Sequence, residues 1–119
     1  MISRMEITKG QKIEENLKDN LDDLLVKMNK LPAIWARPMV VTSGYRSPEY
    51  NKKIGGAAKS DHCLCKAVDI YDPKQELQAW CLKNEQILKD IGLWCEHFCK
   101  TPNWCHFTTS RKSKTFFMP

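Results

Sequence analysis

The most constraining feature of this sequence is a stripe of apolar residues between Lys12 and Asn29. These residues recur mainly at intervals of three or four, and they are Ile13, Leu17, Leu21, Leu24, Leu25 and Met28. This spacing places them on one face of a helix, and charged side chains occupy the opposite face. We therefore predict an amphipathic helix that packs against the rest of the molecule and ends before Pro32.

Four segments beyond this helix have the residue patterns of β-strands, either β-branched runs or alternating polar and apolar side chains. We predict strands over Met39–Thr42, Lys66–Tyr71, Leu93–Phe98 and Trp104–Thr108. Between them we predict a short helix over Glu49–Ile54, a loop over Gly55–Ala58, and a helix from Asp72 to about Lys89 that Gly92 ends. Helices interleaved with short strands predict an α+β domain with a mainly antiparallel sheet.

Length and composition limit the class of protein. The 119 residues suffice for one hydrophobic core, so we predict a single domain over residues 1–119. No apolar run reaches the roughly 18 residues of a membrane span, and the polar segment Met1–Glu15 does not resemble a secretory signal peptide. The net charge of +5 includes a basic segment, Ser110–Lys114, which we interpret as a solvated tail rather than a nucleic-acid site.

Two of the three histidines are placed to meet a carboxylate. His62 precedes the second predicted strand, Asp69 lies near the end of that strand, and His106 lies in the last strand. A turn at Cys63–Cys65 can bring His62 and Asp69 to the same mouth of the sheet. Two His and one carboxylate are the ligands of catalytic zinc sites that keep one position open for water. These three residues are therefore our candidate metal ligands.

Three motifs around these residues occur in the order of a known enzyme family. They are Ser43-Gly44-Tyr45-Arg46-Ser47 followed by Asn51, then Ser60-x-His62 with Ala67-Val68-Asp69, and finally Trp104-x-His106. With these motifs the chain resembles the zinc D-Ala-D-Ala carboxypeptidases and L-Ala-D-Glu endopeptidases, murein hydrolases that share the hedgehog/D,D-peptidase fold. The resemblance covers about Val40 to Thr108, and the small size is similar to bacteriophage members, including endolysins.

The resemblance implies a zinc peptidase that hydrolyses an amide bond in the peptide stem of bacterial peptidoglycan, as a D,D-carboxypeptidase or an L,D-endopeptidase. It implies Zn2+ on His62, Asp69 and His106, and it places Arg46 at the scissile carbonyl and Ser60 at the substrate. A fixed guanidinium at that carbonyl stabilises negative charge that develops in the transition state. We also expect a monomeric, phage-encoded lytic protein, present in the infected cytoplasm before release to the wall or carried in the virion.

One position departs from the family pattern. Members usually carry an acid three residues before the last His ligand, where this chain has Asn103. If residues 93–98 and 104–108 form a hairpin, Glu96 points into the same mouth as His106 and can act as the general base. The alternative is a non-catalytic, zinc-containing murein-binding module of the same fold.

The six cysteines offer competing metal ligands. Cys63, Cys65 and Cys105 flank the candidate ligands, and thiolates bind zinc well, so a mixed His/Cys site is an alternative. The chain lacks the paired Cys-x2-Cys spacing of structural zinc modules, which favours free buried thiols. Cys65 also stands where the family usually has Gly, so we predict a loop that bends differently, because a positive backbone angle strains Cys.

Overall fold

A mainly antiparallel sheet organises the computed structural model, which describes residues 1–57 and 59–118. Its strands are β1 (Val41–Ser43), β2 (Ala67–Tyr71), β3 (Trp94–Glu96), β4 (Trp104–Thr108) and β5 (Phe116–Phe117). They lie in the order β1-β2-β4-β3-β5, and β5 runs parallel to β3 whereas the other neighbouring pairs are antiparallel. The α+β class and the four predicted strands are confirmed, and β5 is an additional strand that the sequence pattern does not predict.

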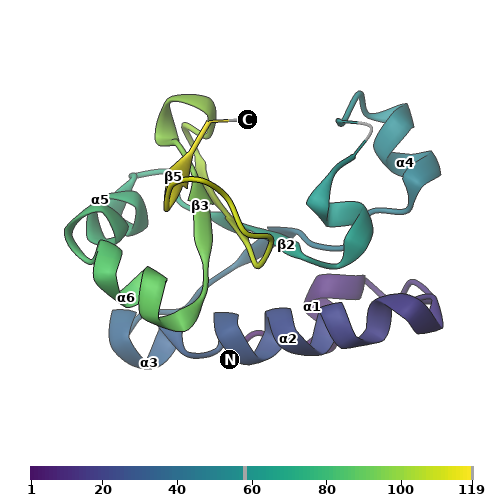
Figure 1. Ribbon diagram of the computed structural model, residues 1–119, viewed down its shortest axis with the longest axis horizontal. Helices are drawn as coiled ribbons and strands as arrows, with labels where there is room; N and C mark the ends of the chain where they lie inside the picture. The colour runs from purple at the N-terminus through teal and green to yellow at the C-terminus, as the bar shows by residue number, and fades with distance from the viewer. Residues whose placement is uncertain (58, 119) are drawn as a thin grey trace.

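Helices α1 (Arg4–Thr8), α2 (Lys18–Met28) and α3 (Leu31–Trp35) lie together beneath the sheet (Figure 1). The predicted apolar stripe forms the buried face of α2, where Leu21, Leu24 and Met28 are fully buried. A 3-10 turn, η1 (Glu15–Leu17), precedes α2, so the helical segment begins later than Lys12. The helix ends before Pro32, as predicted, and Pro32 then stands in the first turn of α3.

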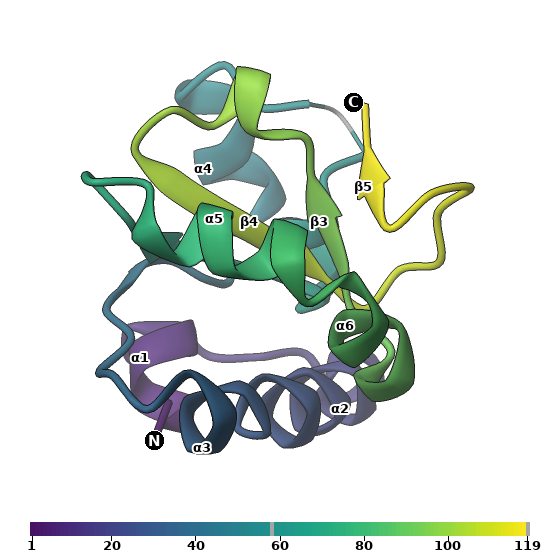
Figure 2. The ribbon, with the colours of Figure 1, turned by 90° about the vertical axis from the view of Figure 1, so that its left-hand side faces the viewer.

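The region between β2 and β3 contains two helices, α5 (Glu76–Lys83) and α6 (Glu85–Ile91). The prediction of one helix from Asp72 to about Lys89 is therefore wrong. Asn84 interrupts it with a non-helical backbone (φ −123°, ψ 37°). Asp72 stays outside the helix, and its carboxylate accepts two backbone N–H groups from the start of α5, at 3.1 and 2.9 Å. Gly92, at φ 94°, ends α6 as predicted. Figure 2 shows α5 lying across β4.

Three short elements complete the described chain: α4 (Pro48–Lys53), η2 (Asp61–Leu64) and η3 (Phe98–Lys100). The helix α4 confirms the predicted short helix to within one residue at each end. Residues 55–57 of the predicted loop form turn and coil, whereas Ala58 lies outside the described residues. Among the residues that are described, no helix has the length and apolarity needed to cross a membrane.

The two faces of the sheet have different roles. Val68, Ile70 and Phe107 project into the hydrophobic core, and none of them is more than 1% exposed. Because successive side chains of a strand point to opposite faces, Asp69 and His106 project to the other side. That second face is where the candidate metal ligands meet.

Gly44 lies where α1 approaches the end of β1 closely. A Cβ at this position would overlap the carbonyl oxygen of Ile7 and lie 2.7 Å from the Ile7 Cα. Backbone atoms cannot rotate aside, so we predict that Gly44→Ala lowers the free energy of unfolding by about 2 kcal/mol or more. Denaturant unfolding followed by circular dichroism measures this loss.

The matched control is Gly55→Ala, whose Cβ would meet no atom within 4 Å. Gly55 has φ +76°, so alanine there is strained only by the left-handed backbone. We expect the free energy of unfolding of this variant to fall by about 1 kcal/mol. Equal losses in the two variants would show that close packing against Ile7 does not determine the effect.

Candidate metal centre

Neighbouring strands place three of the predicted site residues in one row. Asp69 of β2 pairs with His106 of β4 in the antiparallel register. The register between β3 and β4 pairs Cys95 with Phe107, so Glu96, one residue further along β3, comes level with His106. Cross-strand partners project to the same face of a sheet, so Asp69, His106 and Glu96 point the same way.

His62 reaches this row from η2, the short helix before β2. The Ser60 hydroxyl caps η2 by accepting the His62 N–H at 3.2 Å. In the His62 ring, Nδ1 lies 2.7 Å from the Gly44 carbonyl oxygen, so Nδ1 carries the proton and donates it there. The other ring nitrogen, Nε2, faces Asp69 and lies 3.3 Å from its Oδ1.

Among the described residues, His62, Asp69 and His106 lie close enough together to hold one metal ion, and we call them the metal-ligating group. One ligand atom from each residue lies within 4.8 Å of the other two. His106 Nδ1 is 2.9 Å from Asp69 Oδ1, and the buried residues His62 and Asp69 are 3% and 7% exposed. Two imidazole nitrogens and one carboxylate oxygen suit zinc, and three protein ligands leave a position for water or substrate. The geometry therefore fits a single metal ion.

Asp69 is ionised in this setting. Burial alone would raise the pKa of its carboxyl group, but hydrogen bonds with His106 and His62 outweigh burial and lower the pKa to about 2. The carboxylate therefore carries its negative charge at neutral pH, which is the form that binds a cation.

A cavity of about 360 Å³ opens beside the metal-ligating group, and its lining also includes Arg46, Ser60 and Glu96. The Arg46 Nε donates to the Ser43 hydroxyl oxygen at 3.1 Å, and its Nη2 lies 3.6 Å from Asp69 Oδ2. These contacts hold the guanidinium at the cavity wall. The structure thus brings all six residues that the sequence predicts for the site to one cavity.

Asn103, at the position where the family pattern has an acid, is not part of this lining. It is exposed in the turn before β4, and its backbone carbonyl accepts the Asp72 N–H at 2.9 Å. His97 is also absent from this lining, and its Nδ1 accepts the Cys99 N–H at 3.2 Å. Besides Asp69, the acids among the described lining residues are Asp61, which pairs with Lys112, and Glu96.

A family model for peptidase M15 matches residues 1–106. The chain belongs to the peptidase M15 family. The match contains the whole metal-ligating group and ends on His106, its last member. The family that three short motifs predict is therefore confirmed. No curated protein matches the chain with significant sequence similarity.

The M15 site also contains a residue that the sequence analysis does not predict, Lys112. The segment Ser110–Lys114, interpreted as a solvated tail, is exposed at Arg111, Ser113 and Lys114, whereas Lys112 lines the cavity at the candidate ligands. The Lys112 Nζ pairs with Asp61 Oδ2 at 3.1 Å and lies 5.0 Å from the centre of the Phe117 ring. The Ser110 hydroxyl donates to the same Asp61 carboxylate at 2.8 Å, across 49 residues of sequence. Contacts between residues so far apart in the chain leave no local sequence pattern from which they can be predicted.

The cysteines of this M15 chain are not members of the metal-ligating group among the described residues. Cys65 is fully buried, and burial raises the pKa of its thiol to about 11. Cys105 points into the core, where its Sγ lies 3.6 Å from the Asp72 carboxylate. The described residues therefore form no mixed His/Cys site.

Cys65 also shows that the prediction of a differently bent loop before β2 is wrong. It adopts the positive backbone angle itself, at φ 57°, so the loop keeps a conformation that suits Gly rather than bending differently. A left-handed backbone costs a non-glycine residue roughly 1 kcal/mol. Burial of the small apolar side chain offsets that cost.

Proposed function

We propose that this peptidase binds one zinc ion through His62, Asp69 and His106 and hydrolyses an amide bond in the peptide stem of bacterial peptidoglycan. The observation that supports the proposal is the shared cavity, where the metal-ligating group lies beside an arginine and a glutamate. When bound, zinc polarises the scissile carbonyl and makes water a stronger nucleophile.

Arg46 and Glu96 supply the remaining chemistry in this proposal. The guanidinium of Arg46 donates hydrogen bonds to the carbonyl oxygen as negative charge develops on it. Glu96 accepts a proton from the attacking water and passes it to the leaving nitrogen. The Ser60 oxygen accepts the His62 N–H, so the hydroxyl hydrogen of Ser60 can bind the substrate.

The type of bond is the finer part of the proposal. The resemblance of the three motifs favours a D,D-carboxypeptidase or an L,D-endopeptidase, and the resemblance to small phage members alone favours a phage-encoded lytic role. A non-catalytic, zinc-containing murein-binding module is the second candidate, and the amide at Asn103 favours it. The place of Glu96 in the cavity lining favours the enzyme.

Digestion of purified peptidoglycan tests the proposal. We expect the zinc-loaded protein to release fragments that correspond to one hydrolysed amide bond, and EDTA to slow this release by at least about a hundredfold. Mass spectrometry identifies the bond, because loss of terminal D-Ala indicates a carboxypeptidase and separation of L-Ala from D-Glu indicates an endopeptidase. Undiminished release in EDTA contradicts the zinc assignment, and wall binding without release supports the non-catalytic module.

A further inference from the structure

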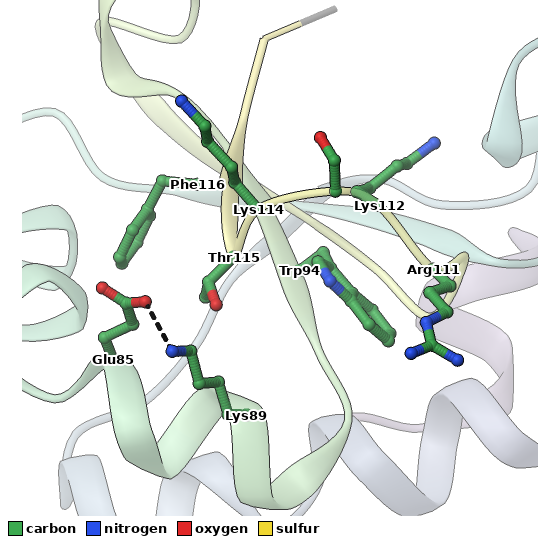
Figure 3. Close-up of a pocket in the computed structure, with 9 residues that line it drawn as sticks. Glu85, Lys89, Trp94, Arg111, Lys112, Lys114, Thr115 and Phe116 are labelled. Atoms are coloured by element: carbon green, nitrogen blue, oxygen red, sulfur yellow. Dashed lines mark ion pairs between the residues drawn. The ribbon is translucent and has the colours of Figure 1, made fainter.

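A second cavity, of about 540 Å³, lies between α6, β3 and the segment that leads to β5 (Figure 3). Four cationic side chains line it, and they are Lys89, Arg111, Lys112 and Lys114. Glu85 is the acidic residue among the described lining residues. The lining is therefore positively charged, and it attracts anions.

Two of these cations have no ion-pair partner within residues 1–57 and 59–118. Lys89 pairs with Glu85 at 3.2 Å, and Lys112 pairs with Asp61 at 3.1 Å. Arg111 and Lys114 are exposed, stand three positions apart on one short segment, and form no ion pair in that part of the chain. A carboxylate or phosphate oxyanion satisfies the N–H donors of such groups with charge-assisted hydrogen bonds.

Aromatic side chains complete the walls of this cavity. Trp94 and Phe116 are half-buried and line it, and Figure 3 shows the Trp94 ring beside Arg111. An indole that is partly open to solvent offers a flat apolar surface with a polar edge. A sugar ring can lie on that surface while an attached oxyanion contacts the cations, so the cavity suits an acidic glycan better than a free inorganic ion.

Lys112 connects this cavity with the metal cavity, because it lines both. A ligand that is a long polymer can therefore contact the two cavities at once. When one part of the polymer binds in one cavity, the effective concentration of the rest of the polymer at the other cavity rises. Binding is then stronger without any new type of interaction.

From these observations we propose that the second cavity binds an acidic glycan segment of the same wall polymer whose peptide stem occupies the metal cavity. An oxyanion contacts Arg111, a sugar ring lies on the neighbouring Trp94, and Lys114 adds positive charge at the opposite side of the cavity. The choice of polymer rests on the proposed function. The oxyanion is either a carboxylate of the peptidoglycan or a phosphate of a polymer attached to it.

Cosedimentation with purified cell walls in EDTA tests this proposal, because it measures binding without hydrolysis. We expect the double variant Arg111→Gln/Lys114→Gln to bind walls about five- to tenfold more weakly than the wild type at low salt. The difference should shrink at high salt, because screening weakens exposed charge interactions. The control Lys30→Gln/Lys83→Gln removes the same charge at exposed positions outside the cavity lining, and we expect it to bind like the wild type.

Walls stripped of phosphate polymers with hydrofluoric acid distinguish the two sources of the oxyanion. Lost binding to stripped walls identifies phosphate, and retained binding identifies the carboxylates of peptidoglycan. Either result supports the proposal if the cavity variant binds more weakly than the wild type.

The proposal is overturned if the cavity variant binds like the wild type, or if the control variant is weakened equally. Tighter binding to a DNA oligonucleotide than to walls, lost in the cavity variant, would also overturn it, in favour of a nucleic-acid site. Failure of the proposed function has a separate signature, which is absence of released peptides from zinc-loaded protein.

Discussion

Asp69→Asn is expected to abolish metal binding and to reduce peptidoglycan hydrolysis by at least about a thousandfold. The carboxylate lies between the two imidazole rings, with Oδ1 2.9 Å from His106 Nδ1 and 3.3 Å from His62 Nε2. Asn has nearly the same shape but no charge, so the variant loses the anionic ligand that neutralises the cation. Metal analysis of the dialysed protein and the release of stem peptides from walls measure the two effects.

Asp22→Asn is the matched control for this experiment. It makes the same chemical change in an exposed ion pair with Arg4, where the charge contributes little. We expect this control to keep one zinc ion and full hydrolysis. An Asp69→Asn protein that still binds one zinc ion and still releases peptides would exclude the proposed ligand set.

The fold was predictable where one residue pattern repeats along the element. The apolar face of α2 repeats over several turns, so that pattern outweighs local exceptions. The helix α1 has five residues and β5 has two, which is too few to show a period. The prediction of one long helix from Asp72 is wrong because Asn84 leaves the helical conformation without a Pro or Gly to mark the break.

The site was predictable to the extent that strand register carries it. An antiparallel hairpin fixes which residues face each other, so the place of Glu96 level with His106 follows from where β3 and β4 begin and end. His62 depends on the turn before β2, where Cys65 accepts a left-handed backbone that its residue type does not favour. Lys112 depends on the fold-back of the segment before β5, held by contacts with Asp61 that only the tertiary structure creates.

Glu96→Gln should lower kcat for stem-peptide hydrolysis by roughly a hundred- to ten-thousandfold while zinc stays bound. The Glu96 side chain lines the metal cavity but does not belong to the metal-ligating group, so its loss removes proton transfer and not the metal. A glutamine keeps the shape and cannot accept the proton of the attacking water. Single-turnover hydrolysis of a stem peptide, with the zinc content measured on the same sample, separates the two roles.

Two further variants decide whether Glu96 acts through its position. Glu49→Gln, at an exposed site in the first turn of α4, is the control for removing one acid, and it should retain full kcat. Adding Asn103→Asp to Glu96→Gln supplies an acid where the family usually has one, but residue 103 is exposed and outside the described lining of the cavity, so we expect no rescue. Wild-type kcat in Glu96→Gln would remove this glutamate from the mechanism. If the wild type and Glu96→Gln bind walls equally and neither releases peptides, the fold serves as a binding module.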